Sequence, residues 1–104
     1  EAQMHRLQLK HQEMAQAEEI VKQVMQAHWS LEEAESRWRV ADSALRRTQE
    51  ALRIAHKRYD VGAGTTLELV TQTAALERAD YSLAQADYQR MQSRAQLRWA
   101  VGAP

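Results

Sequence analysis

The sequence has few residues that interrupt a helix or cross-link a chain. Its 104 residues include three Gly, one Pro, no Cys and no Phe. The absence of Cys excludes a disulfide framework and a thiolate metal site, and it leaves the redox compartment open. The scarcity of Gly and Pro leaves little room for turns, whereas Ala, Gln, Glu, Arg and Leu abound. Combined with a helical period, this composition indicates long helices or a coiled coil rather than a globular core of the usual kind.

An excess of one charge and a long apolar run are also missing. Fourteen Lys and Arg residues balance fourteen Asp and Glu residues, and the two signs are interspersed along the chain. This pattern argues against a nucleic acid or an anionic membrane surface as the main partner. Because no apolar run reaches about 18 residues and no signal-peptide pattern is present, the polypeptide as given is expected neither to span a membrane nor to target itself.

One strong turn signal lies between two long helical runs. Lys57 and Arg58 place positive charge near a helix end, and Gly62 follows where a left-handed C-cap residue is favoured. Thr65 and Glu68 then fit a capping box. In that motif the Thr65 hydroxyl accepts from the Glu68 amide, and the Glu68 carboxylate reaches back to the Thr65 amide.

These signals set the fold class and the boundaries of its elements. The sequence predicts an all-α fold, a long antiparallel helical hairpin of the coiled-coil type. We expect a helix over residues 2–60, a tip over residues 61–65 and a helix over residues 66–101. Gly102 and Pro104 form the stop signal of the second helix.

Apolar residues repeat along the first helix in alternating steps of four and three. From position 20 onward the series is unbroken and mixes large and small side chains, which predicts a close, left-handed helix pair. We call it the inner seam of the first helix, and its members are Ile20, Val24, Ala27, Leu31, Ala34, Trp38, Ala41, Leu45, Thr48, Leu52, Ala55 and Tyr59. Before Ile20 a weaker stripe is shifted in phase and consists of Met4, Leu7, His11 and Met14.

The second helix carries two apolar stripes. Its inner seam can face the first helix, is interrupted by Arg90, and consists of Leu69, Leu76, Ala79, Leu83, Ala86, Leu97 and Ala100. Its outer seam runs along another side and consists of Ala74, Tyr81, Ala84, Tyr88, Met91 and Ala95. The first helix has a weaker outer seam of its own, formed by Val40, Ala44, Ala51 and Ile54. Two apolar stripes on one helix predict two neighbouring helices.

The predicted lengths point to the same conclusion. At about 1.5 Å per residue the first helix would be roughly 90 Å long and the second roughly 55 Å. Roughly the first 20 to 25 residues would then lack a partner from their own chain. A single helix pair buries too little surface to offset the chain entropy, so we expect association with further helices.

No cluster of side chains points to catalysis. The sequence offers no nucleophile with a paired base and no glycine-rich phosphate loop. The four histidines include no pair at i and i+4, so neither a metal site nor another cofactor is predicted. The aromatic residues are interpreted as helix-packing groups, namely Trp29, Trp38, Tyr81, Tyr88 and Trp99.

The turn and its flanks carry a family pattern. Residues 55–70 read AHKRYDVGAGTTLELV, and residues 97–102 read LRWAVG. The pattern begins with an Arg-Tyr pair, two further residues, a Gly and a small polar turn. A helix with an aliphatic-acidic-aliphatic start follows, and a terminal Gly comes some 35 residues later. This pattern resembles the TolC family of outer membrane efflux proteins. It covers about residues 45–102 well, and it covers the N-terminal part through the heptads alone.

The resemblance implies a channel wall. In that family each protomer contributes two such hairpins, and three protomers form a twelve-helix α-barrel that crosses the periplasm beneath an outer membrane β-barrel. Residues 1–104 would then be one periplasmic α-barrel hairpin segment, excised from a larger channel protein of the outer membrane. The parent would be a homotrimer, whereas the isolated chain is expected to form a dimer or a higher helical assembly.

The resemblance also implies where partners bind. The bend corresponds to the periplasmic tip, which docks on a periplasmic adaptor (membrane fusion) protein and thereby reaches the inner membrane transporter indirectly. The residues that match this docking tip are Tyr59, Val61, Gly62, Ala63, Gly64 and Thr65. The pore or gate candidates are Asp60, Glu68 and Thr71, of which Glu68 matches an acidic position and Thr71 stands where relatives can carry a second acid.

A generic coiled-coil interaction hairpin is the alternative function. A periplasmic adaptor's own hairpin is one example, and its tip carries Arg, Leu and Ser at a fixed spacing that is not found around Gly62. The exported substrate, whether a metal ion, a drug or a protein, and the class of transporter are left open.

Overall fold

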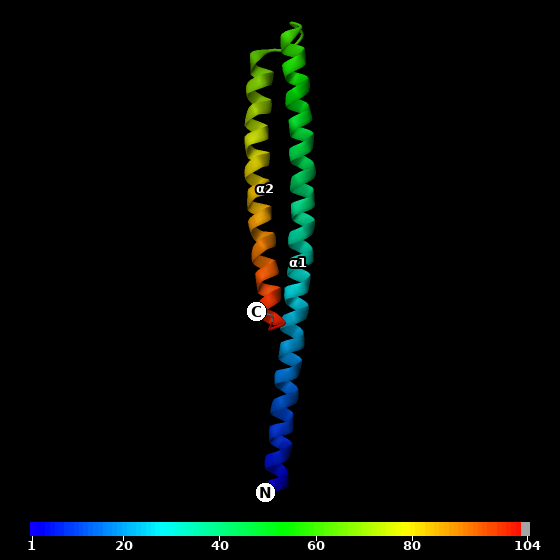
Figure 1. Cartoon of the computed structure of the whole chain (residues 1–104), viewed down its shortest axis with the longest axis vertical. Helices are drawn as coiled ribbons and strands as arrows, with labels where there is room; N and C mark the ends of the chain where they lie inside the picture. The colour runs from blue at the N-terminus through cyan, green and yellow to red at the C-terminus, as the bar shows by residue number, and fades with distance from the viewer. Residues whose placement is uncertain (103–104) are drawn as a thin grey trace.

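The computed structural model describes residues 1–102 and consists of two helices joined by a tight bend (Figure 1). Helix α1 spans Ala2–Asp60, and helix α2 spans Thr66–Ala100. The predicted helical hairpin is confirmed, with boundaries within a residue of those expected. Its long dimension is 91 Å, as the predicted length of α1 requires. Pro104, part of the predicted stop signal, lies outside the described residues.

The inner seams are the surfaces along which α1 and α2 pack. Every inner-seam residue of α1 from Val24 to Ala55 is buried or partly buried, and so is every inner-seam residue of α2. Among residues 1–102 the buried hydrophobic residues are all alanines, namely Ala34, Ala55, Ala79 and Ala86. Because the alanine side chain is short, the two backbones can approach closely while larger residues close the sides of the contact.

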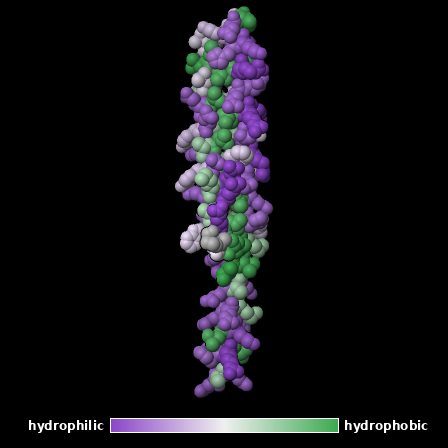
Figure 2. Space-filling model, viewed as in Figure 1, coloured by the Kyte–Doolittle hydropathy of each residue, from purple (hydrophilic) through white to green (hydrophobic). Residues whose placement is uncertain are grey.

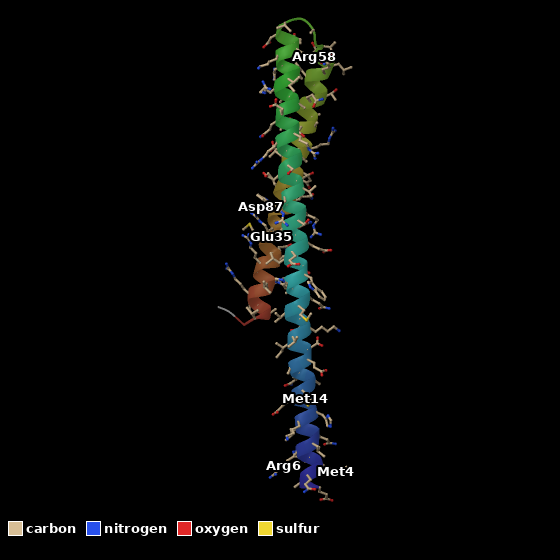
Figure 3. All side chains as sticks on the ribbon, turned by 90° about the vertical axis from the view of Figure 1, so that its right-hand side faces the viewer. Met4, Arg6, Met14, Glu35, Arg58 and Asp87 are labelled. Carbon is tan, nitrogen blue, oxygen red and sulfur yellow. The ribbon has the colours of Figure 1, made fainter. Side chains whose placement is uncertain are left out.

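Within residues 1–102, no helix lies beside the N-terminal part of α1. We call residues 2–23 the arm, which extends beyond the end of α2 (Figures 1 and 3). All of its residues are exposed, including Met4, Met14 and Val21. The predicted overhang is therefore confirmed, and its apolar stripe faces solvent.

The outer seam of α2 is also uncovered. Tyr81, Tyr88 and Met91 are 66%, 63% and 60% exposed. Trp99 is 86% exposed, so its interpretation as a packing group finds no partner within residues 1–102. Figure 2 shows hydrophobic residues running along the hairpin and gathering near the level at which α2 ends.

A polar layer interrupts the inner seam in the lower part of the hairpin. Arg90 lies over the ring of Trp38 and donates to Asp87 across 2.7 Å. Arg94 joins the two helices through a 3.0 Å hydrogen bond to Glu35. Figure 3 places Glu35 and Asp87 at neighbouring levels of the shaft. Apolar packing is therefore divided into a long block toward the tip and a short block near the end of α2.

Within residues 1–102, neither helix has a segment of the length and hydropathy needed to cross a bilayer.

Candidate functional site

The C-terminus of α1 closes in a Schellman motif. The amide of Ala63 donates to the carbonyl of Arg58 at 2.8 Å, and the amide of Gly62 donates to the carbonyl of Tyr59 at 3.0 Å. Gly62 adopts a φ of +77°, in the left-handed region that favours glycine. The sequence-based placement of Gly62 as the left-handed residue is confirmed.

Gly64 is required for a different reason. Its amide donates to the same Arg58 carbonyl at 2.9 Å, which holds the chain against the end of α1. A Cβ atom at this position would lie 3.1 Å from both the Cβ of Arg58 and the amide nitrogen of Tyr59. The bend therefore uses one glycine for its backbone conformation and the other for its lack of a side chain.

Thr65 begins the return helix. Its backbone is extended, with φ −112° and ψ 158°, and its hydroxyl accepts a 3.1 Å hydrogen bond from the amide of Glu68. This half of the predicted capping box is confirmed. The other half is wrong, because no hydrogen bond among the described residues joins the Glu68 carboxylate to the Thr65 amide. The carboxylate lies 3.7 Å from the guanidinium of Arg58 instead.

Arg58 is the residue that sequence reasoning undervalued. Its carbonyl accepts the amides of Ala63 and Gly64, and its guanidinium donates to the carbonyl of Ala63 at 3.4 Å while facing Glu68. Figure 3 shows it directly at the bend. The sequence signals at this position were the positive charge near the helix end and the Arg-Tyr pair before Gly62, and neither predicted a contact of Arg58 across the bend. In the structure Arg58 connects the end of α1, the bend and the start of α2.

Large apolar side chains are exposed around this fixed backbone. Val61 is 79% exposed, Leu67 74%, Val70 60% and Tyr59 46%. We call these four residues the tip surface. Tyr59 and Val61 belong to the predicted docking set, whereas Leu67 and Val70 do not. Their signal was present in the sequence as large apolar residues in the first turns of α2 that fall outside its inner seam.

The remaining predicted residues surround the tip surface. Ala63 is exposed beside Val61 in the bend. Of the three pore or gate candidates, Asp60 and Thr71 are exposed on different helices, while Glu68 is partly buried beside Arg58. The structure thus pairs one candidate, Glu68, with Arg58 at the end of α1.

A groove lies between the helices just below the bend. Its lining combines apolar side chains with one acidic and one basic side chain, and the residues are Ala51, Ile54, Ala55, Arg58, Glu68 and Gln72. Within residues 1–102, no group of three or more His, Cys, Asp or Glu side chains is placed to hold a metal ion. The tip surface and this groove are the apolar features that the described residues expose at the bend.

Comparison with known proteins gives a single informative result. A family model described as "Outer membrane efflux protein" matches residues 1–103. The comparisons with curated proteins and with solved structures gave no significant match.

Proposed function

Since the chain belongs to the outer membrane efflux protein family, we propose that its hairpin forms part of the periplasmic wall of a homotrimeric channel. In this proposal the bend docks on a periplasmic adaptor protein, and the adaptor connects the channel to an inner membrane transporter. Proteins of this family are components of efflux channels rather than enzymes. Substrates would leave through the lumen that the assembled hairpins enclose.

The two seams of α2 support a place within a wall. The inner seam is covered by α1, while Tyr81, Tyr88 and Met91 of the outer seam are mostly exposed. A helix that carries apolar residues on two sides is suited to lie between two neighbours, and a closed ring of helices supplies both.

The observation that carries the docking proposal is the exposure of Val61 and Leu67 on a rigid bend. Exposed large apolar side chains in contiguous patches mark interaction sites. Here the backbone beneath them is held by the Schellman motif and by the Thr65 cap. A partner that packs on a backbone already ordered loses little conformational entropy at the interface.

The pore or gate role of Asp60, Glu68 and Thr71 belongs to the same proposal. Glu68 faces Arg58 at 3.7 Å, and both side chains are more than one third exposed. Such a loose pair can exchange partners when a neighbouring subunit or a docked adaptor supplies another charge. Thr71 contributes no charge, so a second acidic ring would depend on Asp60.

The test uses the full channel that contains this hairpin. Val61→Asp and Leu67→Asp place a carboxylate on the tip surface and leave Gly62, Gly64 and the Thr65 hydroxyl unchanged. Gln89→Asp, at an exposed position of α2 outside both seams, is the matched control. We expect each tip variant to weaken adaptor binding at least tenfold in a pull-down or interferometry assay, and the control to bind normally.

Circular dichroism must show unchanged helicity for all three variants. Normal adaptor binding by folded Val61→Asp and Leu67→Asp channels would refute the docking tip. That result would favour the reading of the chain as a generic coiled-coil interaction hairpin.

A further inference from the structure

Between its seams the hairpin has two open faces, and a contact from α1 to α2 marks each of them. On one face Arg58 and Glu68 lie 3.7 Å apart, and we call it the Arg58 face. On the other, Arg94 donates to Glu35 at 3.0 Å, and we call it the Glu35 face. In a coiled pair of helices, residues seven positions apart lie on the same side of a helix. Ser82, two heptads after Glu68, therefore belongs to the Arg58 face.

The outer seam of α1 lies toward the Arg58 face. Its member Ala51 precedes Arg58 by one heptad. Val40 and Ile54 are 65% and 46% exposed, and Arg47 between them interrupts the seam. Because successive residues of a coiled pair are about 103° apart around the helix, the centre of this outer seam is about 105° from the centre of the inner seam. The smaller angle between the two seams opens on the Arg58 face.

The outer seam of α2 lies almost opposite its inner seam. The same geometry separates the two seam centres by about 155° through the Glu35 face and by about 205° through the Arg58 face. The narrower side holds a single line of residues, which ends at Arg94. The wider side holds two lines, one with Thr71 and Arg78 and the other with Glu68 and Ala75.

Neighbouring helices on both outer seams would make a wall curve at each helix. Contacts about 105° apart turn the wall at α1 by about 75°, with the Arg58 face on the inside of the turn. Contacts about 155° apart turn it at α2 by about 25° in the opposite sense. The net turn is about 50° for each hairpin, toward the Arg58 face. A closed ring of such hairpins therefore has the Arg58 face on its inner side.

We propose that in the channel wall, on whose existence this inference rests, the Arg58 face lines the lumen and Arg78 selects among charged substrates. The pore or gate candidates Glu68 and Thr71 lie on the same face. Arg78 is exposed, and at about 1.5 Å per residue it lies about 15 Å beyond Glu68 along α2.

Arg78 supplies the net charge of this face in the shaft. Arg58 faces Glu68, and Arg37, three heptads before Arg58, lies 3.7 Å from Glu33. The ion pairs within residues 1–102 do not include Arg78. Its copies in a trimer would form a ring of positive charge, which raises the local concentration of anions and lowers that of cations. The shaft is therefore expected to favour anionic substrates.

Beyond Arg78 the face carries no charge on α2 over the next two heptads. The exposed residues there are Ser82, Gln85, Gln89 and Gln92. In each heptad a glutamine amide donates to the tyrosine hydroxyl four positions earlier at 3.1 Å, from Gln85 to Tyr81 and from Gln92 to Tyr88. These bonds hold the amides at the border between the outer seam and the Arg58 face. Because neutral amides and hydroxyls carry no net charge, selection by charge in this part of α2 depends on Arg78.

The lumen assignment is tested by labelling single cysteines in the full channel, from which any other cysteine has been removed. Ser82→Cys lies on the Arg58 face, and Gln49→Cys lies at an exposed position of the Glu35 face, two heptads after Glu35. Each variant is treated with a small maleimide and with a maleimide carried by a large polyethylene glycol. We expect Ser82→Cys to react at least tenfold more slowly with the large reagent, because the lumen excludes it. Gln49→Cys should react with both at similar rates, and in urea both variants should do so.

The role of Arg78 is tested with the full channel in planar bilayers under a salt gradient. We expect Arg78→Glu to shift the reversal potential toward that of the cation, and Arg78→Gln to shift it less in the same direction. Arg39→Glu makes the same charge change at an exposed position of α1 turned away from the Arg58 face. This matched control should leave the reversal potential unchanged.

Several outcomes would overturn the proposal. Rapid reaction of Ser82→Cys with the large reagent, protection of Gln49→Cys from it, or no reaction of Ser82→Cys with either reagent would refute the lumen assignment. A shift in Arg39→Glu as large as that in Arg78→Glu would refute the role of Arg78. A folded channel that conducts no ions would refute the proposed wall itself, whereas the other outcomes arise in a channel that conducts. Neither measurement involves adaptor binding, so failure of this inference is distinguishable from failure of the proposed function.

Discussion

The guanidinium carbon of Arg90 lies 4.2 Å from the centroid of the Trp38 ring, and this contact fills the one position at which the leucine series of α2 is broken. The Arg90 side chain is only 21% exposed. One guanidinium nitrogen bonds to Asp87, while the buried Nε has no hydrogen-bond partner. The cation–π contact therefore offsets part of the cost of burying a charge in an apolar seam.

Replacement of Arg90 by Leu tests whether the cation–π contact outweighs the cost of burying the arginine charge. We expect Arg90→Leu to leave the free energy of unfolding unchanged or to raise it by about 1 kcal/mol, because it removes an unsatisfied buried donor and completes the seam. Trp38→Ala should lower that free energy by about 2 kcal/mol, since it deletes the packing surface beneath position 90. Urea denaturation followed by circular dichroism at one fixed chain concentration measures both. A loss of more than about 1 kcal/mol in Arg90→Leu would show that the arginine is a net stabilising residue.

The two glycines of the bend should respond differently to substitution. Gly62→Ala places a side chain at a φ of +77° and should cost about 1–2 kcal/mol, whereas Gly62→Asn should cost less because Asn tolerates the left-handed region. At Gly64 both Ala and Asn introduce the Cβ that clashes with Arg58, so both should destabilise the hairpin. Thermal unfolding of the four variants distinguishes the left-handed backbone at position 62 from the close contact at position 64. Equal effects of Ala and Asn at position 62 would contradict the conformational explanation.

The start of α2 should depend on Thr65 more than on Glu68. Thr65→Ala removes the 3.1 Å cap and should cost about 1 kcal/mol, while Thr65→Ser should restore most of it. Glu68→Gln removes only a loose ion pair at the surface and should cost well under 1 kcal/mol, and this loss of stability should shrink at high salt. Denaturation at two salt concentrations checks whether Thr65→Ala loses more stability than Glu68→Gln. A larger loss in Glu68→Gln than in Thr65→Ala would assign the main role at the bend to the Arg58–Glu68 pair.

The Glu50 carboxyl gives a prediction for how the stability of the helix depends on pH. A hydrogen bond from the Arg53 guanidinium lowers the pKa of the Glu50 carboxyl below the ordinary 4.5, and the charges of Arg53 and Lys57 act in the same direction. A lowered folded-state pKa stabilises the helix above the unfolded-state value, and this contribution is lost as the pH falls through the folded-state value. Carboxyl-carbon NMR titration should show a lower midpoint for Glu50 in the native chain than in Arg53→Gln. Identical midpoints would show that the pair does not persist in solution.

Much of the fold was predictable because its signals are local. Helix boundaries follow from Gly62, Thr65 and Gly102, whose backbone preferences act within one turn of the chain. The inner seam follows from the heptad period alone, and its burial from Val24 to Ala55 confirms it. The family pattern around the bend led to the same family that the comparison identified over residues 1–103.

The sequence by itself determined the two helices, the side on which each meets the other, and the need of Gly62 for a left-handed backbone. Only the tertiary structure decided that Gly64 touches Arg58, that Arg58 rather than the Thr65 amide faces Glu68, and that Leu67 is exposed at the tip. It also joined Glu35 to Arg94, which are 59 positions apart. Such contacts depend on the rotation and relative level of two helices, and the shape of the bend sets both, whereas a heptad pattern records the period of each helix separately.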